Sequence, residues 1–310
     1  MSNISGEPTL QTADPALSNL QDEPLIPSRP LWLETLARIF RRKPVLIALV
    51  ILLAIVASSI LAPQIAPYDP LEMHQDFPRE PPSTRFLLGT DEIGRDLFSR
   101  VLYAGRPSLI LALMSVLLAM TVGTILGLVS GYGGAVVDAI IMRITDAVIA
   151  FPWLLMAILI VSVLGPGPQN TILAIAFIGI PGVIRMTRAT VLVQKQMEYV
   201  LAARIVGGSE LSIALRHILP NILPSSLVVA SLTAATAIQT EAAVGFLGLG
   251  IQPPDSSWGL LLRRGYQFYT VAPWYISSTA IVVTLTIWSL NTLGDGLRDA
   301  LDPRLRGVTK

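Results

Sequence analysis

The feature of this sequence that most constrains its fold is a long apolar run without a charged residue. The run extends from Pro44 to Ala62. Its length suits an α-helix that crosses a hydrocarbon layer of about 30 Å. The preceding Arg41-Arg42-Lys43 cluster is also typical of a signal peptide, but the run is longer than a usual signal core and lies deep in the chain. We therefore expect residues 44–62 to form an uncleaved first transmembrane helix.

Five further apolar runs follow the first. They lie at about 109–129, 144–164, 170–187, 221–244 and 274–293. The chain is 52% hydrophobic and 14% charged, which is far from the composition of a soluble domain. The sequence thus predicts an all-α membrane protein with six transmembrane helices. In the fourth run, Pro181-Gly182 marks a place where a helix can kink.

The distribution of Lys and Arg predicts the orientation. Residues 1–43 contain five such residues, the 185–216 loop five, and the C-terminal tail four. On the opposite side, the arginines of the first loop are offset by acidic residues, and Arg263 and Arg264 are the only two in the 246–273 loop. The positive-inside rule therefore places both termini and the 185–216 loop in the cytoplasm.

These boundaries define the expected organisation of the chain. Residues 1–43 form a flexible cytoplasmic tail with a short interfacial helix over 31–40, anchored by Trp32 and Phe40. A first helix over 44–62 is followed by a polar, proline-rich extracytoplasmic loop over 63–107. Residues 108–296 form a domain of five further helices interrupted by a cytoplasmic loop over 186–220, and 297–310 form a second cytoplasmic tail.

The cytoplasmic loop contains a stretch from Glu198 to Pro220 that reads as two short helices. Gly207-Gly208 breaks the first helix, because two residues without a Cβ favour a turn. Ser209 is then a plausible N-cap. The second helix carries an apolar stripe at i, i+3, i+4 and i+7 (Leu211, Ala214, Leu215 and Ile218). Pro220 fits the first turn of the next transmembrane helix.

The first of these short helices is apolar on nearly all sides, with only Glu198 and Arg204 charged. Such a helix must be covered on both faces. The membrane helices can cover one face, and the groove of a partner protein can cover the other. A loop that folds back on its own bundle explains the pattern equally well at this point.

Charged residues near or inside the apolar runs suggest internal ion pairs. Arg143 and Asp146 stand at i, i+3 and are expected to pair beside Asp138 at the cytoplasmic interface. Glu241 lies deep in the fifth run, so it must face the bundle or a water-filled cavity and find a partner. Arg95, Arg100 or Arg106 are the expected partners. A gate or pathway role and a plain salt bridge remain equal alternatives for Glu241.

Several functions are excluded by what the sequence lacks. There is no cysteine, and the two histidines, His74 and His217, fall on opposite sides of the membrane in this topology. H-E-x-x-H and G-x-S-x-G motifs are absent, so an enzyme is not expected, and neither is a cofactor or metal. No lysine follows a glycine, so the chain has no Walker A phosphate loop. A net charge of +1 argues against nucleic acid as a partner.

The 198–220 stretch resembles the cytoplasmic loop E-A-A-x3-G-x9-I-x-L-P of permease subunits in binding-protein-dependent ABC importers. Residues Ala202, Ala203, Gly207, Leu219 and Pro220 match this pattern. Leu201 stands where the family has Glu, with Glu198 one helical turn before it, and His217 stands where the family has Ile. The resemblance implies that this loop docks into a cleft of a separate ATP-hydrolysing subunit.

Three more stretches resemble the dipeptide/oligopeptide/nickel branch of these permeases. The segment from Gly89 to Arg100 resembles G-T-D-x-x-G-R-D-x-x-S-R, and Gly105, Arg106, Ser108 and Leu109 continue the resemblance. The other two segments are 241–259 and 291–304. In the first of these, Gly245 and Ser256 replace the usual Ser and Pro. Together the matches cover about residues 87–306.

The resemblance implies the C-type subunit of such an importer, with a type I ABC importer permease fold in a bacterial inner membrane. Its implied partners are a homologous permease subunit, two ATP-binding subunits and an extracytoplasmic solute-binding protein. Peptides are the leading substrates, and nickel, glutathione and oligosaccharides are the alternatives. A secondary transporter is the distant alternative, but it would be expected to carry internal repeats and paired broken helices, and neither is evident.

Overall fold

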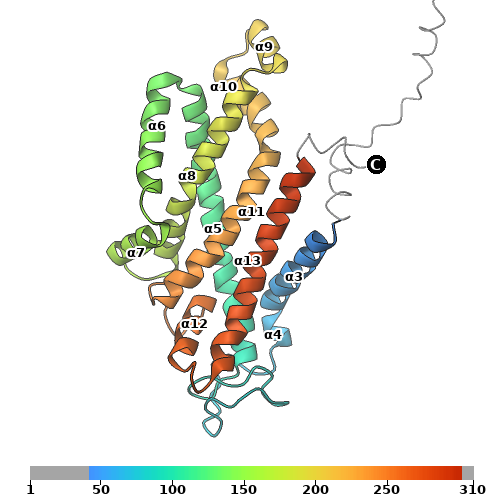
Figure 1. Cartoon of the computed structure of the whole chain (residues 1–310), viewed down its shortest axis with the longest axis vertical. Helices are drawn as coiled ribbons and strands as arrows, with labels where there is room; N and C mark the ends of the chain where they lie inside the picture. Colours follow the sequence, from blue (N-terminus) through green and yellow to red (C-terminus); the bar gives the residue numbers. More distant parts are fainter. Residues whose placement is uncertain (1–41, 302–310) are drawn as a thin grey trace, which may run out of the picture.

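A computed structural model describes residues 42–301 and contains helices and loops without a β-sheet in that range. The expected interfacial helix over 31–40 and the end of the C-terminal tail lie outside the described residues. Figure 1 shows long helices running roughly side by side, with short helices at both ends of the bundle.

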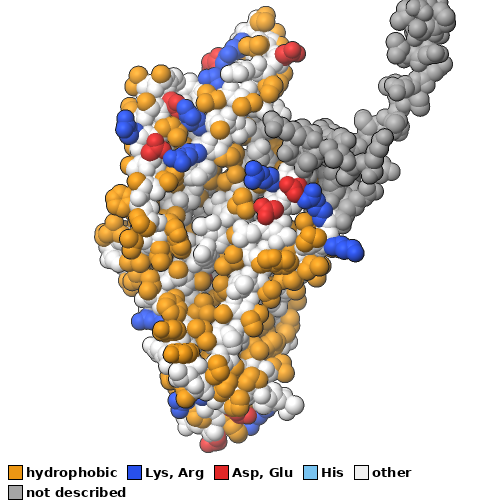
Figure 2. Space-filling model, viewed as in Figure 1, with side chains coloured by type: hydrophobic (Ala, Val, Ile, Leu, Met, Phe, Trp, Pro, Cys, Tyr) orange, Lys and Arg blue, Asp and Glu red, His pale blue; other side chains and the backbone are white. Residues whose placement is uncertain are grey.

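The long helices are α3 (Lys43–Ile60), α5 (Leu97–Tyr132), α8 (Pro168–Gln194), α11 (Leu219–Phe246) and α13 (Pro273–Leu301). All five are long and apolar enough to cross a membrane. The bent pair α6 (Gly134–Ile149) and α7 (Trp153–Leu164) makes a sixth span if it is counted as one. Figure 2 shows a largely hydrophobic middle zone, with charged side chains mostly toward the two ends. The all-helical membrane fold expected from the sequence is confirmed.

The third expected span, 144–164, is wrong as a single straight helix. The chain bends by 92° between α6 and α7. The break falls at Phe151-Pro152, where proline cannot donate a main-chain hydrogen bond and disfavours helical geometry in the residue before it. The α6 helix also begins ten residues earlier than expected, at Gly134. Pro152 is present in the sequence, but the apolar run continues past it, so hydropathy alone did not predict the break.

Other helices differ from the expected runs at their ends. The α5 helix begins at Leu97 behind an Asp96 cap, so the amphipathic helix that the sequence indicates from Leu97 to Tyr103 is continuous with the second span. The α8 helix passes through Pro181 without ending, and α13 continues to Leu301. The outer loop between α11 and α13 contains a helix that was not expected, α12 (Trp258–Gln267), which Ser257 caps by accepting a hydrogen bond from the Leu260 N–H.

Close packing between α5 and α8 depends on glycines at every fourth position. A Cβ added to Gly123, Gly127 or Gly131 would lie 2.5–2.6 Å from the nearest side-chain atom of Val183, Thr187 or Val191. Small residues at this spacing let the two backbones approach closely. The G-x-x-x-G of the second span therefore serves helix packing, as its sequence indicates.

The ion pairs of the bundle are not the expected ones. Arg143 was expected to pair with Asp146, but Asp146 instead binds Arg185 of α8 at 2.5 Å. Asp138 binds Arg188 of α8 and also accepts a hydrogen bond from Ser130. Both carboxylates thus tie α6 to the neighbouring helix α8 and not to a residue of their own helix.

The start of α3 and the end of α13 lie at the same end of the molecule. Arg42 forms an ion pair with Asp299, and a Cβ on Gly296 would meet Val45 at 2.8 Å. The described part of the chain therefore begins and ends on the same side of the bundle (Figure 1).

Candidate functional site: the 198–220 tip

The 198–220 stretch forms a projecting tip at one end of the molecule (Figure 1). Its first helix is α9 (Glu198–Ile205), as expected. The second helix is not separate. Helix α10 (Glu210–Ile213) continues through the π-helical turn η1 (Ala214–Ile218) into α11, with Pro220 in its first turn.

The turn between α9 and α10 has the geometry of a Schellman motif. The Gly208 N–H donates to the Ala203 carbonyl at 3.0 Å, and the Gly207 N–H donates to the Arg204 carbonyl at 2.9 Å. Gly207 has a φ of +87°, which residues with a Cβ rarely adopt. Ser209 then accepts a hydrogen bond from the Ser212 N–H and caps α10.

A bidentate ion pair spans this turn. Arg204 Nε and one terminal nitrogen donate to the two carboxylate oxygens of Glu210 at 2.8 and 3.0 Å. The hydrogen bond with Glu210 raises the pKa of the Arg204 guanidinium. The pair joins the end of α9 to the start of α10, so it helps to set the angle between them.

One face of the tip is anchored on the membrane helices. Val200 of α9 is fully buried in a cluster with Val191 of α8 and Ile213, Ile218 and Ile222. The Asn221 side chain donates to the His217 carbonyl at 2.6 Å and so ties the start of α11 to η1. The sequence-level alternative of a loop folded on its own bundle is therefore correct for this face.

The other face is apolar, and none of residues 42–301 covers it. The exposed fractions of Ile205, Val206 and Leu211 are 85%, 88% and 71%. Leu201 and Leu215 are also exposed, and Leu211 and Leu215 line a groove of about 630 Å³ with the end of α5. Single exposed apolar residues are common, but a contiguous set on one rigid element is typical of an interaction surface.

The residues matched to the family loop lie around this surface. Glu198 and Ala202 are exposed on α9, and Gly207 is exposed at the turn. Ala203 and Leu219 are half-buried and pack against the anchoring cluster, whereas Pro220 is exposed at the base. The sequence did not indicate that Val200 and Ile213 anchor the tip, because buried and exposed apolar residues alternate there without a polar face.

Glu241 is buried in the bundle, as expected, but without the expected arginine partner. Its side chain has an exposed fraction of 1%, and neither carboxyl oxygen has a hydrogen-bond partner within residues 42–301. The expected arginine partners are wrong. Arg95 and Arg100 bind Asp91 at 2.6 and 3.5 Å, and Arg106 donates to main-chain carbonyls at the end of α3. Ser108 and Ser257 are the polar neighbours of Glu241.

Glu92 holds the first outer loop against the bundle. Glu92 accepts hydrogen bonds from Arg264 of α12 at 2.8 Å and from the Tyr275 hydroxyl of α13 at 3.0 Å. Burial raises the pKa of Glu92, but a main-chain hydrogen bond, the Tyr275 hydroxyl and the charges of Arg264 and Arg95 outweigh it and lower the pKa overall. The loop, α12 and α13 thus form one connected outer surface.

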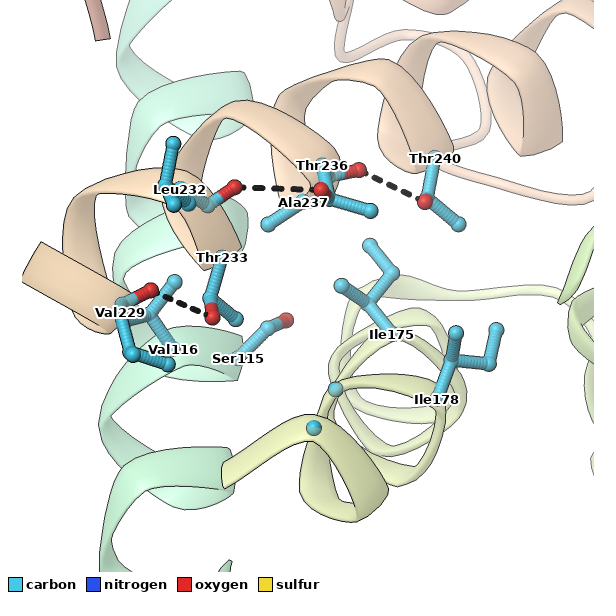
Figure 3. A pocket seen from close by; sticks show the side chains of 12 residues that line it. Ser115, Val116, Ile175, Ile178, Val229, Leu232, Thr233, Thr236, Ala237 and Thr240 are labelled. Atoms are coloured by element: carbon cyan, nitrogen blue, oxygen red, sulfur yellow. Dashed lines mark hydrogen bonds between the residues drawn. The ribbon is translucent and has the colours of Figure 1, made fainter. Parts of the chain in front are cut away.

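A cavity of about 230 Å³ lies between α5, α8 and α11 (Figure 3). From α11 it is lined by residues 229, 232, 233, 236, 237 and 240, which share one helical face. Ser115 of α5 and Ile178 of α8 contribute to the other walls. Glu241 does not line this cavity, although its neighbour Thr240 does.

Comparison with known proteins identifies the family. Residues 123–307 match the family of binding-protein-dependent transport system inner membrane components, and residues 30–82 match the N-terminal TM domain of oligopeptide transport permease C. The Di/tripeptide transport system permease protein DppC of Pseudomonas aeruginosa is 42% identical over 84% of this chain and 88% of its own. The Glutathione transport system permease protein GsiD of Pectobacterium atrosepticum is 40% identical over 90% and 93%.

The fold is shared with a more distant solved structure. A chain of the MetNI methionine ABC transporter, in inward-facing conformations, superposes with a TM-score of 0.54 at 17% identity, covering 66% of this chain and 98% of that one. This chain therefore belongs to the family of inner-membrane permease subunits of binding-protein-dependent ABC importers, which implies an ATPase and a solute-binding protein as its partners.

Proposed function

We propose that the chain is the C-type permease subunit of an importer for short peptides, working with a homologous permease subunit, two ATP-binding subunits and a solute-binding protein. The relatives at about 40% identity are named for di- and tripeptides, dipeptides and glutathione. Glutathione is itself a modified tripeptide, so both groups of relatives favour short peptides over nickel or oligosaccharides.

The observation that carries this proposal is the exposed apolar face of the tip, with Ile205, Val206 and Leu211 at its centre. An ATP-binding subunit covers this face in the assembled transporter and closes around it. The loop residues Glu198, Ala202, Ala203, Gly207, Leu219 and Pro220 form or support the contact. A few apolar anchors held in fixed register supply most of the affinity of such interfaces.

One helical segment connects the tip directly to the cavity between α5, α8 and α11. Glu210 to Phe246 is a nearly continuous helical segment of 37 residues, about 55 Å long at 1.5 Å per residue. Thr233, Thr236 and Thr240 lie on this segment beside the cavity. Closure of the ATPase moves the tip, and this helical segment transmits the movement to the cavity wall.

We place the tip and both termini in the cytoplasm, on the basis of the Lys/Arg distribution and the Arg42–Asp299 pair. Cysteines introduced at Ser83 and Gln252, which lie in the two outer loops, should react with a membrane-impermeant reagent added outside intact cells. A cysteine at Ser209 should react only after the membrane is opened. Labelling of Ser209→Cys from outside would contradict the orientation.

Docking is tested with charged substitutions on the exposed face. The Ile205→Glu/Val206→Glu variant should insert normally but lose co-purification with the ATP-binding subunits, because a groove that buries apolar anchors cannot solvate carboxylates. Val136→Glu is the matched control, since Val136 is 72% exposed on α6, outside the tip. Full co-purification of the tip variant would refute docking at this face.

A further inference from the structure

The cavity between α5, α8 and α11 is lined by hydroxyl groups whose protons are already used. Thr233 donates to the Val229 carbonyl at 2.7 Å, Thr236 to the Leu232 carbonyl at 3.1 Å, and Thr240 to the Thr236 carbonyl at 2.7 Å (Figure 3). A hydroxyl has one proton and two lone pairs. Because each proton bonds to the main chain, these groups can offer a ligand only lone pairs.

The lining therefore favours ligands that carry hydrogen-bond donors. No residue that lines this cavity carries a charge, so no cation is available to hold a carboxylate or phosphate. Ser115 donates to the Leu111 carbonyl at 2.7 Å and is an acceptor in the same way. Amide N–H and ammonium groups suit such a surface, whereas an anion would meet only lone pairs.

The spacing along α11 matches the length of a short peptide. Thr233 and Thr240 are seven residues apart, about 10 Å along the helix axis at 1.5 Å per residue. An extended chain rises about 3.4 Å per residue, so this distance spans roughly three residues. Thr236 lies between them on the same face.

The cavity forms only one part of a larger binding site. Its volume of about 230 Å³ is below the roughly 300–1,000 Å³ of a complete small-molecule site. Thr236 is exposed, and so is Gln239 one turn further along α11. Polar side chains within a membrane span face protein or a water-filled space and not lipid, so this face of α11 belongs to the interior of the assembled transporter.

We propose that Thr233, Thr236 and Thr240 form a contact site for the passing peptide, which accepts hydrogen bonds from the peptide N–H groups and gives no binding to its terminal carboxylate. This inference rests on the proposed function and specifies its recognition chemistry. Since every peptide bond without proline carries an N–H, contacts of this kind are independent of side-chain sequence.

The test uses the complete importer in proteoliposomes, with its solute-binding protein, and radiolabelled trialanine as the probe. A Thr233→Val/Thr236→Val variant keeps the shape of both side chains and removes both acceptors. We expect trialanine uptake to fall roughly tenfold. Thr233→Ser/Thr236→Ser retains the hydroxyls and should retain uptake. Thr121→Val is the matched control, because Thr121 makes the same bond to the Leu117 carbonyl on α5 but lies outside the cavity.

A second probe is trialanine with both peptide nitrogens methylated, supplied at concentrations that saturate the solute-binding protein. Its uptake by the wild-type importer should be low and insensitive to the double substitution. Equal trialanine uptake by the wild type and the Thr233→Val/Thr236→Val variant would overturn this inference alone. A wild-type importer that takes up no trialanine would overturn the proposed function, and this inference with it.

Discussion

Replacing Gly207 by valine tests whether the angle of the tip governs coupling. Gly207 has a φ of +87°, and a Cβ placed there would meet nothing within 4 Å. The effect of the substitution is therefore confined to the backbone, with no steric clash. A left-handed conformation costs an L-residue about 1–2 kcal/mol, and a β-branched residue is more strongly disfavoured.

We expect a local cost of about 2 kcal/mol for Gly207→Val, within the range of 1–3 kcal/mol for strained backbone positions. This lowers the fraction of protein with the Schellman geometry relative to relaxed turns by about 30-fold. The apparent Kd for the ATP-binding subunits should rise by up to this factor, because only the competent fraction binds and the full factor applies once relaxed turns dominate. The bundle should remain intact, since Gly207 lies outside every span.

The assay titrates purified permease with its ATP-binding subunits and measures membrane abundance, binding and peptide uptake. Gly134→Val is the matched control. Gly134 has a φ of +79° and equally open surroundings, but it is the first residue of α6 and lies outside the 198–220 tip. Gly134→Val should keep binding and transport. The reasoning is refuted if Gly207→Val binds and transports normally, or if Gly134→Val loses ATPase binding to the same extent.

Three further predictions concern packing and buried charge. Gly127→Leu should separate α5 from α8, because a Cβ would lie 2.5 Å from Thr187, and it should lower thermal stability by about 2–3 kcal/mol, whereas Gly182→Ala, which has open space, should not. Glu92→Gln should lower the free energy of unfolding of the permease at neutral pH by about 1–3 kcal/mol. Because the pKa of Glu92 is lowered in the folded state, its contribution is present above the unfolded pKa and is lost as pH falls through the folded one, so acid-melting curves of wild type and variant should converge. Glu241→Gln should melt at the same or a higher temperature and still transport, because a neutral amide is easier to bury than an ionised carboxylate; a stable variant without transport would instead support a gate.

Local features could be predicted from the sequence because they depend on only a few neighbouring residues. The length of the 44–62 run sufficed to predict a membrane helix, since hydrocarbon thickness fixes the number of residues required. Gly207-Gly208 followed by Ser209 predicted a helix end and a helix start, and both are confirmed. The motif residues likewise identified the family.

Contacts between helices were decided only by the tertiary structure. An apolar helix has no polar face to show which side meets its neighbour, so the sequence could not reveal that Asp138 and Asp146 face the arginines of α8. The same limit hid the serine neighbours of Glu241, which stand where arginines were expected, and the anchoring of the tip by Val200. Local spacing determines which residues share a helix face. The rotation and packing of whole helices determine what that face meets, and these depend on residues far apart in the chain.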